Sequence, residues 1–139
     1  MEQRVSRRHE HRIPADLARL REARDFAERV ATEFGFDPAG RYQLKLAMSE
    51  AVTNAIQHGS SSPEDQVQIT ATEEGDALAF YVQDTGRFVP RIERRGDLPE
   101  SGRGLDFMRR LMDEVDLRPG DEGTLLRFSK RISTADDHV

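Results

Sequence analysis

A change in the spacing of apolar residues constrains the fold of this chain more than any other feature. Between residues 17 and 58, apolar side chains recur every three or four positions, in two runs separated by a short break at 37–40. This spacing is typical of amphipathic helices. From residue 66 onward, short segments appear in which apolar and polar residues alternate, as they do in half-buried strands. Helices and strands grouped in this way predict an α+β domain.

Start and stop residues bound the predicted elements. Pro14 and Asp16 precede the first helix and Gly35 ends it, while a second helix spans about 41–58 and ends before Gly59. Strands are predicted over 66–72, 78–82, 115–117 and 124–128, with a third helix over 102–115 and a candidate edge strand over 8–13. We therefore expect a two-layer sandwich in which helices pack on one face of a mixed sheet.

Length and composition narrow the class of protein. The 139 residues suit one domain, which we expect at 14–132 between an N-terminal arm (1–13) and a flexible tail (133–139). The absence of cysteine excludes disulfides and thiolate chemistry. No apolar run approaches the ~18 residues of a membrane span, and none follows the first methionine as a secretory signal would. We expect a cytoplasmic protein.

Two polar residues of the second helix are candidates for chemistry. Glu50 and Asn54 lie four residues apart and so face the same way. A carboxylate there can accept a proton from a hydroxyl, and an amide oxygen suits magnesium, which prefers hard oxygen ligands. The alternative is a solvated helix face. His58 is a candidate base, or a histidine stabilised by the helix dipole.

Three further motifs follow along the chain. Asp84-Thr85-Gly86 comes after an apolar strand, where a carboxylate can accept a hydrogen bond from a base; an ordinary turn is the alternative. Gly102-Arg103-Gly104-Leu105 opens the third predicted helix, where N–H groups would cradle phosphate unless the glycines are only a linker. Gly123-Thr124 begins the last strand, where the threonine either packs or reaches a nucleotide. The aperiodic stretch 87–101 is expected to be a lid.

The order of these motifs resembles the GHKL (Bergerat-fold) ATPases, and in particular the anti-sigma-factor serine kinases. Residues 50–59 are similar to the N-box of that family, Asp84-Thr85-Gly86 to its first glycine box, Gly102-Arg103-Gly104-Leu105 to its second, and Gly123-Thr124 to its final box. The resemblance covers roughly residues 17–128.

The resemblance implies roles for these residues. Glu50 would be the catalytic base and Asn54 the magnesium ligand, while the residues expected to contact ATP are Asn54, Asp84, Gly86, Gly102, Arg103, Gly104, Leu105 and Thr124. It further implies a bacterial anti-sigma factor, acting in transcription regulation and stress response, that sequesters a sigma factor. Its kinase activity would phosphorylate an anti-anti-sigma (STAS-type) protein on serine, and a homodimer is expected.

One departure from the family pattern leaves an alternative open. The family's first glycine box usually has a second glycine two positions after the first, and Phe88 stands there in this chain. A large side chain at that position would reshape the phosphate end of the pocket. The second hypothesis is therefore a weak or inactive binding module of the same fold that regulates a partner by protein exchange.

A third, unrelated hypothesis is a nucleic-acid binder. Arginines occur near the N-terminus and in the predicted lid, at Arg4, Arg7, Arg8, Arg12, Arg91, Arg94 and Arg95. The net charge of −5 argues against it, because nucleic-acid binding needs a basic surface. We therefore expect neither direct nucleic-acid binding nor membrane binding.

Overall fold

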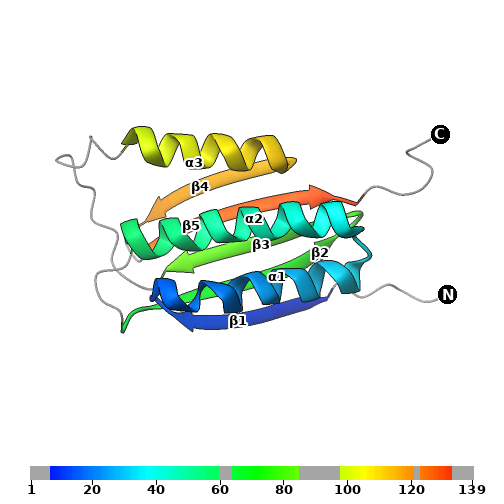
Figure 1. Ribbon diagram of the computed structural model, residues 1–139, viewed down its shortest axis with the longest axis horizontal. Coiled ribbons are helices and arrows are strands. Elements are labelled where there is room, and N and C mark those ends of the chain that lie inside the picture. Colours follow the sequence, from blue (N-terminus) through cyan, green and yellow to red (C-terminus); the bar gives the residue numbers. More distant parts are fainter. Residues whose placement is uncertain (1–6, 60–63, 85–97, 121–122, 133–139) are drawn as a thin grey trace.

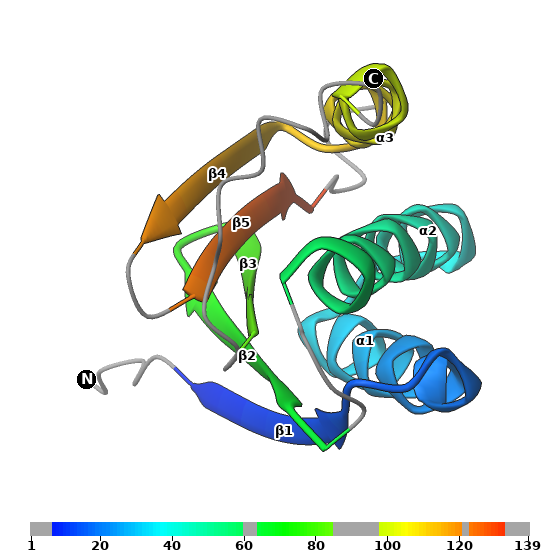
Figure 2. The ribbon, with the colours of Figure 1, turned by 90° about the vertical axis from the view of Figure 1, so that its left-hand side faces the viewer.

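The chain folds into two layers (Figures 1 and 2). The computed structural model describes residues 7–59, 64–84, 98–120 and 123–132. One layer is a five-stranded sheet with the strand order β1-β2-β3-β5-β4. The other is a layer of three helices that cover one face of the sheet, as the end-on view in Figure 2 shows. The predicted α+β sandwich is confirmed.

After the single strand β1, helical segments alternate with pairs of strands. In chain order they are β1 (Arg8–Pro14), a 3₁₀ turn η1 (Leu17–Arg19), α1 (Leu20–Phe34), α2 (Pro38–Asn54), a π-helical turn η2 (Ala55–Gly59), β2 (Gln66–Glu74), β3 (Ala77–Asp84), α3 (Leu98–Leu111), β4 (Glu114–Gly120) and β5 (Gly123–Arg131). No helix in the described ranges is long and apolar enough to cross a membrane.

The sheet is antiparallel at each of its four pairings, so the prediction of a mixed sheet is wrong. Helical connections between strands are typical of parallel pairs, which explains the prediction. Here two successive helices, α1 and α2, return the chain so that β2 runs antiparallel to β1. The single helix α3 does leave β4 running in the same direction as β3, but β5 lies between those two strands.

Capping residues fix the ends of the first two helices. Gly35 ends α1 with a left-handed φ of 110°, a conformation that glycine adopts without steric cost. The side chain of Asp37 accepts a hydrogen bond from the N–H of Gly40 at 2.8 Å, so α2 begins at Pro38, three residues before the predicted start. Proline is well tolerated there because the first N–H groups of a helix have no intrahelical partner.

The third helix begins earlier than the sequence predicts. It starts at Leu98 rather than at residue 102, and it ends at Leu111 rather than at 115. Pro99 is compatible with this start because it lies in the first turn. Both glycines of the second glycine box therefore lie inside the helix. Packing of Met108 and Met112 against the core, where both are buried, holds the helix on the sheet.

The core lies between the helices and the sheet. Its centre contains Phe80 of β3 stacked on Phe128 of β5, with ring centroids 5.3 Å apart, and Phe26 of α1 meets Phe80 edge to face at 6.3 Å. These rings link three elements that are distant in sequence. Other fully buried large side chains fill the space around them: Ile13, Val30, Leu44, Met48, Val52, Val67, Ile69, Leu78 and Met108.

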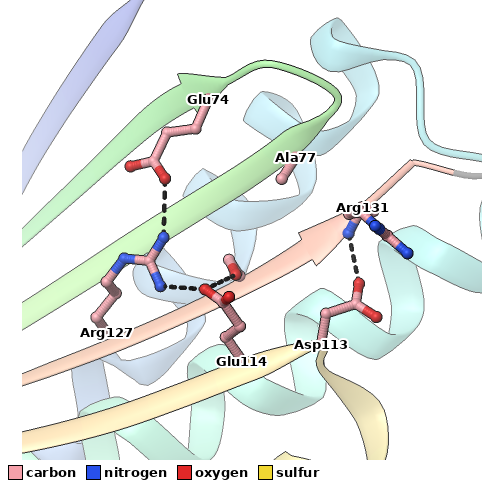
Figure 3. Close-up of a pocket in the computed structure, with 7 residues that line it drawn as sticks. Glu74, Ala77, Asp113, Glu114, Arg127 and Arg131 are labelled. Atoms are coloured by element: carbon pink, nitrogen blue, oxygen red, sulfur yellow. Dashed lines mark hydrogen bonds and ion pairs between the residues drawn. The ribbon is translucent and has the colours of Figure 1, made fainter.

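A polar network joins four strands on the face of the sheet that the helices leave uncovered (Figure 3). Arg127 donates to Glu74 and Glu114, each at 2.8 Å, and to the hydroxyl of Tyr81 at 3.2 Å. Burial would by itself raise the pKa of Glu74, but hydrogen bonds from Thr72, Arg127 and Tyr81 outweigh it and hold that pKa below its ordinary value. Glu74 therefore stabilises the fold in its ionised form.

Removing this guanidinium is expected to destabilise the fold modestly. Arg127→Met should cost roughly 1–2 kcal/mol, low for charged hydrogen bonds because Glu114 is 65% exposed. The difference from wild type should be fully present above about pH 4.5, the ordinary pKa of Glu74, and should shrink as pH falls through its lowered folded value.

Urea unfolding across this pH range measures the difference. Arg118→Met is the matched control, because its ion pair with Asp116 is exposed and should contribute about 0–1 kcal/mol. Equal costs for the two variants at neutral pH would show that the network contributes no more than a surface ion pair.

Candidate functional site

The second helix holds its two candidate residues at the surface of the core. Glu50 and Asn54 are half-buried and lie one turn apart on α2. The neighbouring positions Met48, Ala51 and Val52 are buried against the sheet, so they anchor the helix. The carboxylate and the amide therefore share a face that is fixed by packing on the opposite side.

The third helix lies beside α2 at these two residues. A Cβ atom added to Gly104 would lie 2.9 Å from Oε1 of Glu50 and 3.8 Å from Nδ2 of Asn54. The backbone of α3 at Gly104 thus lies so close to the carboxylate that no room is left for a side chain at position 104. Residues of the N-box and of the second glycine box, about fifty positions apart in sequence, meet in one place.

A second group of candidate residues lies at the end of β3. Asp84 is fully buried, and its Oδ2 accepts a hydrogen bond from the backbone N–H of Thr124 at 3.2 Å. The hydroxyl Oγ1 of Thr124 is also buried and has no hydrogen-bond partner within the described part of the chain. An unsatisfied buried hydroxyl is costly. A polar ligand beside Asp84 would satisfy it.

The π-helical turn η2 connects the two groups. It follows Asn54 directly and packs against β3 and β5, the strands that carry Asp84 and Thr124. In Figure 1 the end of α2, the end of β3 and the start of α3 all lie at the same side of the molecule. Single π-turns within helices occur often at functional sites. No pattern in the sequence distinguished this turn from ordinary helix.

The predicted phosphate cradle takes a different form in the structure. The N–H groups without an intrahelical acceptor lie in the first turn of α3, which begins at Leu98, and Pro99 in that turn has no N–H. Gly102 and Gly104 lie beyond them, so the prediction that their N–H groups are exposed at a helix start is wrong for this conformation. Arg103 lies between them in the helix, and Leu105 is half-buried against the core, where it anchors α3.

Several predicted residues lie outside the described ranges. These are Gly86, Phe88 and most of the predicted lid, whose last residues, 98–101, instead form the first turn of α3. The side chain of His58 is likewise not described. Whether Phe88 weakens activity therefore stays a prediction.

The oxygen atoms available as metal ligands suit a magnesium ion that is held mainly by a bound substrate. No group of three or more histidine, aspartate or glutamate side chains in the described ranges is placed to bind a metal. Magnesium in phosphoryl-transfer sites usually takes one or two protein oxygens and completes its shell with phosphates and water. The amide oxygen of Asn54, beside Glu50, fits that requirement.

A hollow of about 430 Å³ lies elsewhere, on the uncovered face of the sheet (Figure 3). It is lined by Glu74, Glu114 and Arg127 of the polar network, together with Ala77, Asp113, Ser129 and Arg131. Its strand residues lie next in sequence to residues of the hydrophobic core such as Leu78, Leu126 and Phe128, so they point away from α2 and α3. No local sequence pattern indicates this cluster, because its members are up to 57 residues apart and only strand pairing brings them together.

The sequence matches one protein family over most of its length. The family described as "Histidine kinase-like ATPase domain" matches residues 13–130. This range runs from the end of β1 to β5 and includes every residue expected to contact ATP or to act as the base.

Individual relatives and a solved structure agree with this match. The chain is 30% identical to "Serine-protein kinase RsbW" of Bacillus velezensis over 138 residues, covering 89% of this chain and 85% of the relative. It is 32% identical to "Anti-sigma F factor" of Bacillus licheniformis, covering 66% and 69%. The crystal structure of the RsbU and RsbW domains of a Mycobacterium tuberculosis protein superposes with a TM-score of 0.69 at 23% identity, covering 91% of this chain and 33% of that one. This last likeness concerns the fold alone.

Proposed function

Because this chain belongs to the histidine kinase-like ATPase family, we propose that it is an anti-sigma factor and an ATP-dependent protein-serine kinase. The observation that carries the proposal is the meeting of Glu50, Asn54 and Gly104, connected through η2 to the hydrogen-bonded pair Asp84–Thr124. A base, an amide oxygen and a buried acceptor at one end of the molecule are the groups that phosphoryl transfer from a nucleotide requires.

Asp84 and Thr124 are proposed to read the base of the nucleotide. A buried carboxylate accepts a hydrogen bond from the amino group of adenine, and the backbone N–H of Thr124 holds that carboxylate in place. The buried hydroxyl of Thr124 is free to bond a second polar atom on the same edge of the base. Gly86, two residues beyond Asp84, is proposed to let the backbone approach the ring.

The helix residues are proposed to act at the phosphates. The serine oxygen would bond to the γ-phosphorus of ATP as the bond to ADP, the leaving group, breaks, and magnesium would neutralise part of the phosphate charge. Glu50 accepts the proton of the attacking serine hydroxyl, and the amide oxygen of Asn54 holds the metal. Residues 102–105 are proposed to lie beside the phosphates. Gly102 and Gly104 have no side chain that would keep the phosphates away, and Arg103 lies between them.

The partners are proposed from the relatives. "Serine-protein kinase" and "Anti-sigma F factor" are the names of those proteins. For this chain we propose a sigma factor as the sequestered partner and a serine of an anti-anti-sigma protein of the STAS type as the phosphorylated one. A homodimer is proposed as the working form.

Loss of the Asp84 charge tests the nucleotide assignment. Asp84→Asn should weaken ATP binding by about 1.5–3 kcal/mol, the range for a hydrogen bond to a charged group. The substitution preserves size, and the asparagine oxygen still accepts from Thr124. Calorimetric titration with magnesium and ATP measures the change.

The matched control is Asp116→Asn, on β4, which loses the same charge at a half-exposed position. Its ATP affinity should equal that of wild type. Equal affinity in the wild type and in Asp84→Asn would remove Asp84 from the nucleotide site.

A further inference from the structure

Glu50 and Gly104 are in a contact that only glycine permits. A Cβ atom at position 104 would lie 2.9 Å from Oε1 of Glu50 and 3.9 Å from its Cδ. Cβ atoms essentially never approach another heavy atom within 3.0 Å. The carboxylate therefore occupies its present position only because residue 104 has no side chain. Glycine inside a helix otherwise disfavours the helix relative to alanine.

The backbone of α3 is the fixed partner in this contact. Met108 is fully buried, Leu105 is half-buried against the core, and Lys130 donates to the carbonyl of Leu111 at 3.3 Å. These contacts tie the helix to the sheet below it. The carboxylate of Glu50 stands at the end of a rotatable side chain and must adapt to the helix.

We propose that Gly104 is a positioning residue for Glu50, setting where the carboxylate of the base can lie. This inference rests on the proposed kinase function and goes beyond it, because it gives the second glycine box an action on the protein's own base in addition to any action on the nucleotide. Asn54 is affected much less, since its nearest atom would lie 3.8 Å from the added Cβ, an ordinary contact.

Gly104→Ala separates the two actions. If the carboxylate is displaced by about 1 Å, phosphorylation should slow by roughly 10²-fold, as misplacement of that size does in other enzymes. The affinity for ATP should change much less than the rate, because Asn54, the proposed magnesium ligand, is not moved. In Glu50→Gln, which has already lost the base, adding Gly104→Ala should cause little further loss of rate.

A readout without phosphorylation keeps this inference distinct from the proposed function. The ¹³Cδ resonance of Glu50 in the nucleotide-free protein should shift in Gly104→Ala. Asp106→Ala, an exposed neighbour on α3, should leave both the resonance and the rate unchanged while also favouring the helix.

An unshifted Glu50 resonance in Gly104→Ala would overturn the inference. So would an ATP affinity that falls in proportion to the rate, since that would place Gly104 on the nucleotide instead. If the wild type phosphorylates no partner, the proposed function fails, while the resonance still decides whether Gly104 places Glu50.

Discussion

Glu50→Gln is expected to slow phosphorylation of the partner protein by about 10²–10⁴-fold. This is the range contributed by a positioned group that accepts a proton in the transition state. Glutamine keeps the size of the side chain and an acceptor oxygen, but it cannot take up the proton of the serine hydroxyl. Single-turnover transfer of labelled phosphate measures the rate.

Binding measurements on the same variant separate chemistry from recognition. ATP affinity and sigma-factor affinity should stay near wild type, because the loss arises only in the transition state. Asn54→Ala is the contrasting variant, in which nucleotide binding itself should weaken through loss of the magnesium ligand. Loss of sigma-factor binding in Glu50→Gln would instead assign this face of α2 to the partner rather than to catalysis.

Phe80→Ala is expected to cost about 3–5 kcal/mol in the free energy of unfolding. The ring is fully buried between Phe128 and Phe26, so its removal leaves a cavity where three elements meet. A loss of this size is a large part of the ~5–15 kcal/mol that stabilises a typical domain. Urea unfolding followed by circular dichroism measures it.

The control for this substitution is Phe107→Ala on α3. Phe107 is 41% exposed, so its loss should cost about 0.5 kcal/mol or less. Similar costs at the two positions would contradict the assignment of Phe80 to the centre of the core.

The local elements of the fold were largely predictable, because their signals are local. Gly35 ended the first helix as expected, since its left-handed conformation is one that glycine favours. Alternating apolar residues correctly predicted β2, β3 and β5. Each strand is longer than predicted: β2 extends further at its C-terminal end, and β3 and β5 extend further at both ends. The start of α2 was missed because Pro38 was interpreted as a break, whereas Asp37 caps the helix there.

Features set by tertiary contacts were not predictable. β5 can pair with β3 because β4 lies outside β5, at the edge of the sheet. No single segment of the sequence encodes this strand order. The early start of α3 places Gly104 in the helix interior, against its propensity. Contact with Glu50 explains why glycine stands there, and that contact joins residues from two distant helices.

The candidate site was found by the order of its motifs rather than by any one of them. Glu50 and Asn54 were placed on one helix face by spacing alone, and the structure has them there. The hydrogen bond from Thr124 to Asp84 was not anticipated, because it spans forty residues and depends on the register of β3 against β5.

Transfer of the γ-phosphate of labelled ATP to an anti-anti-sigma protein tests the central claim most directly. The assay combines this protein, magnesium and ATP with each anti-anti-sigma candidate encoded in the same genome. The account predicts label on a serine of one candidate, lost in Glu50→Gln and retained in Asp106→Ala. Tight binding of a sigma factor by a wild-type protein that labels no candidate would contradict the kinase assignment and favour a binding module that works by protein exchange.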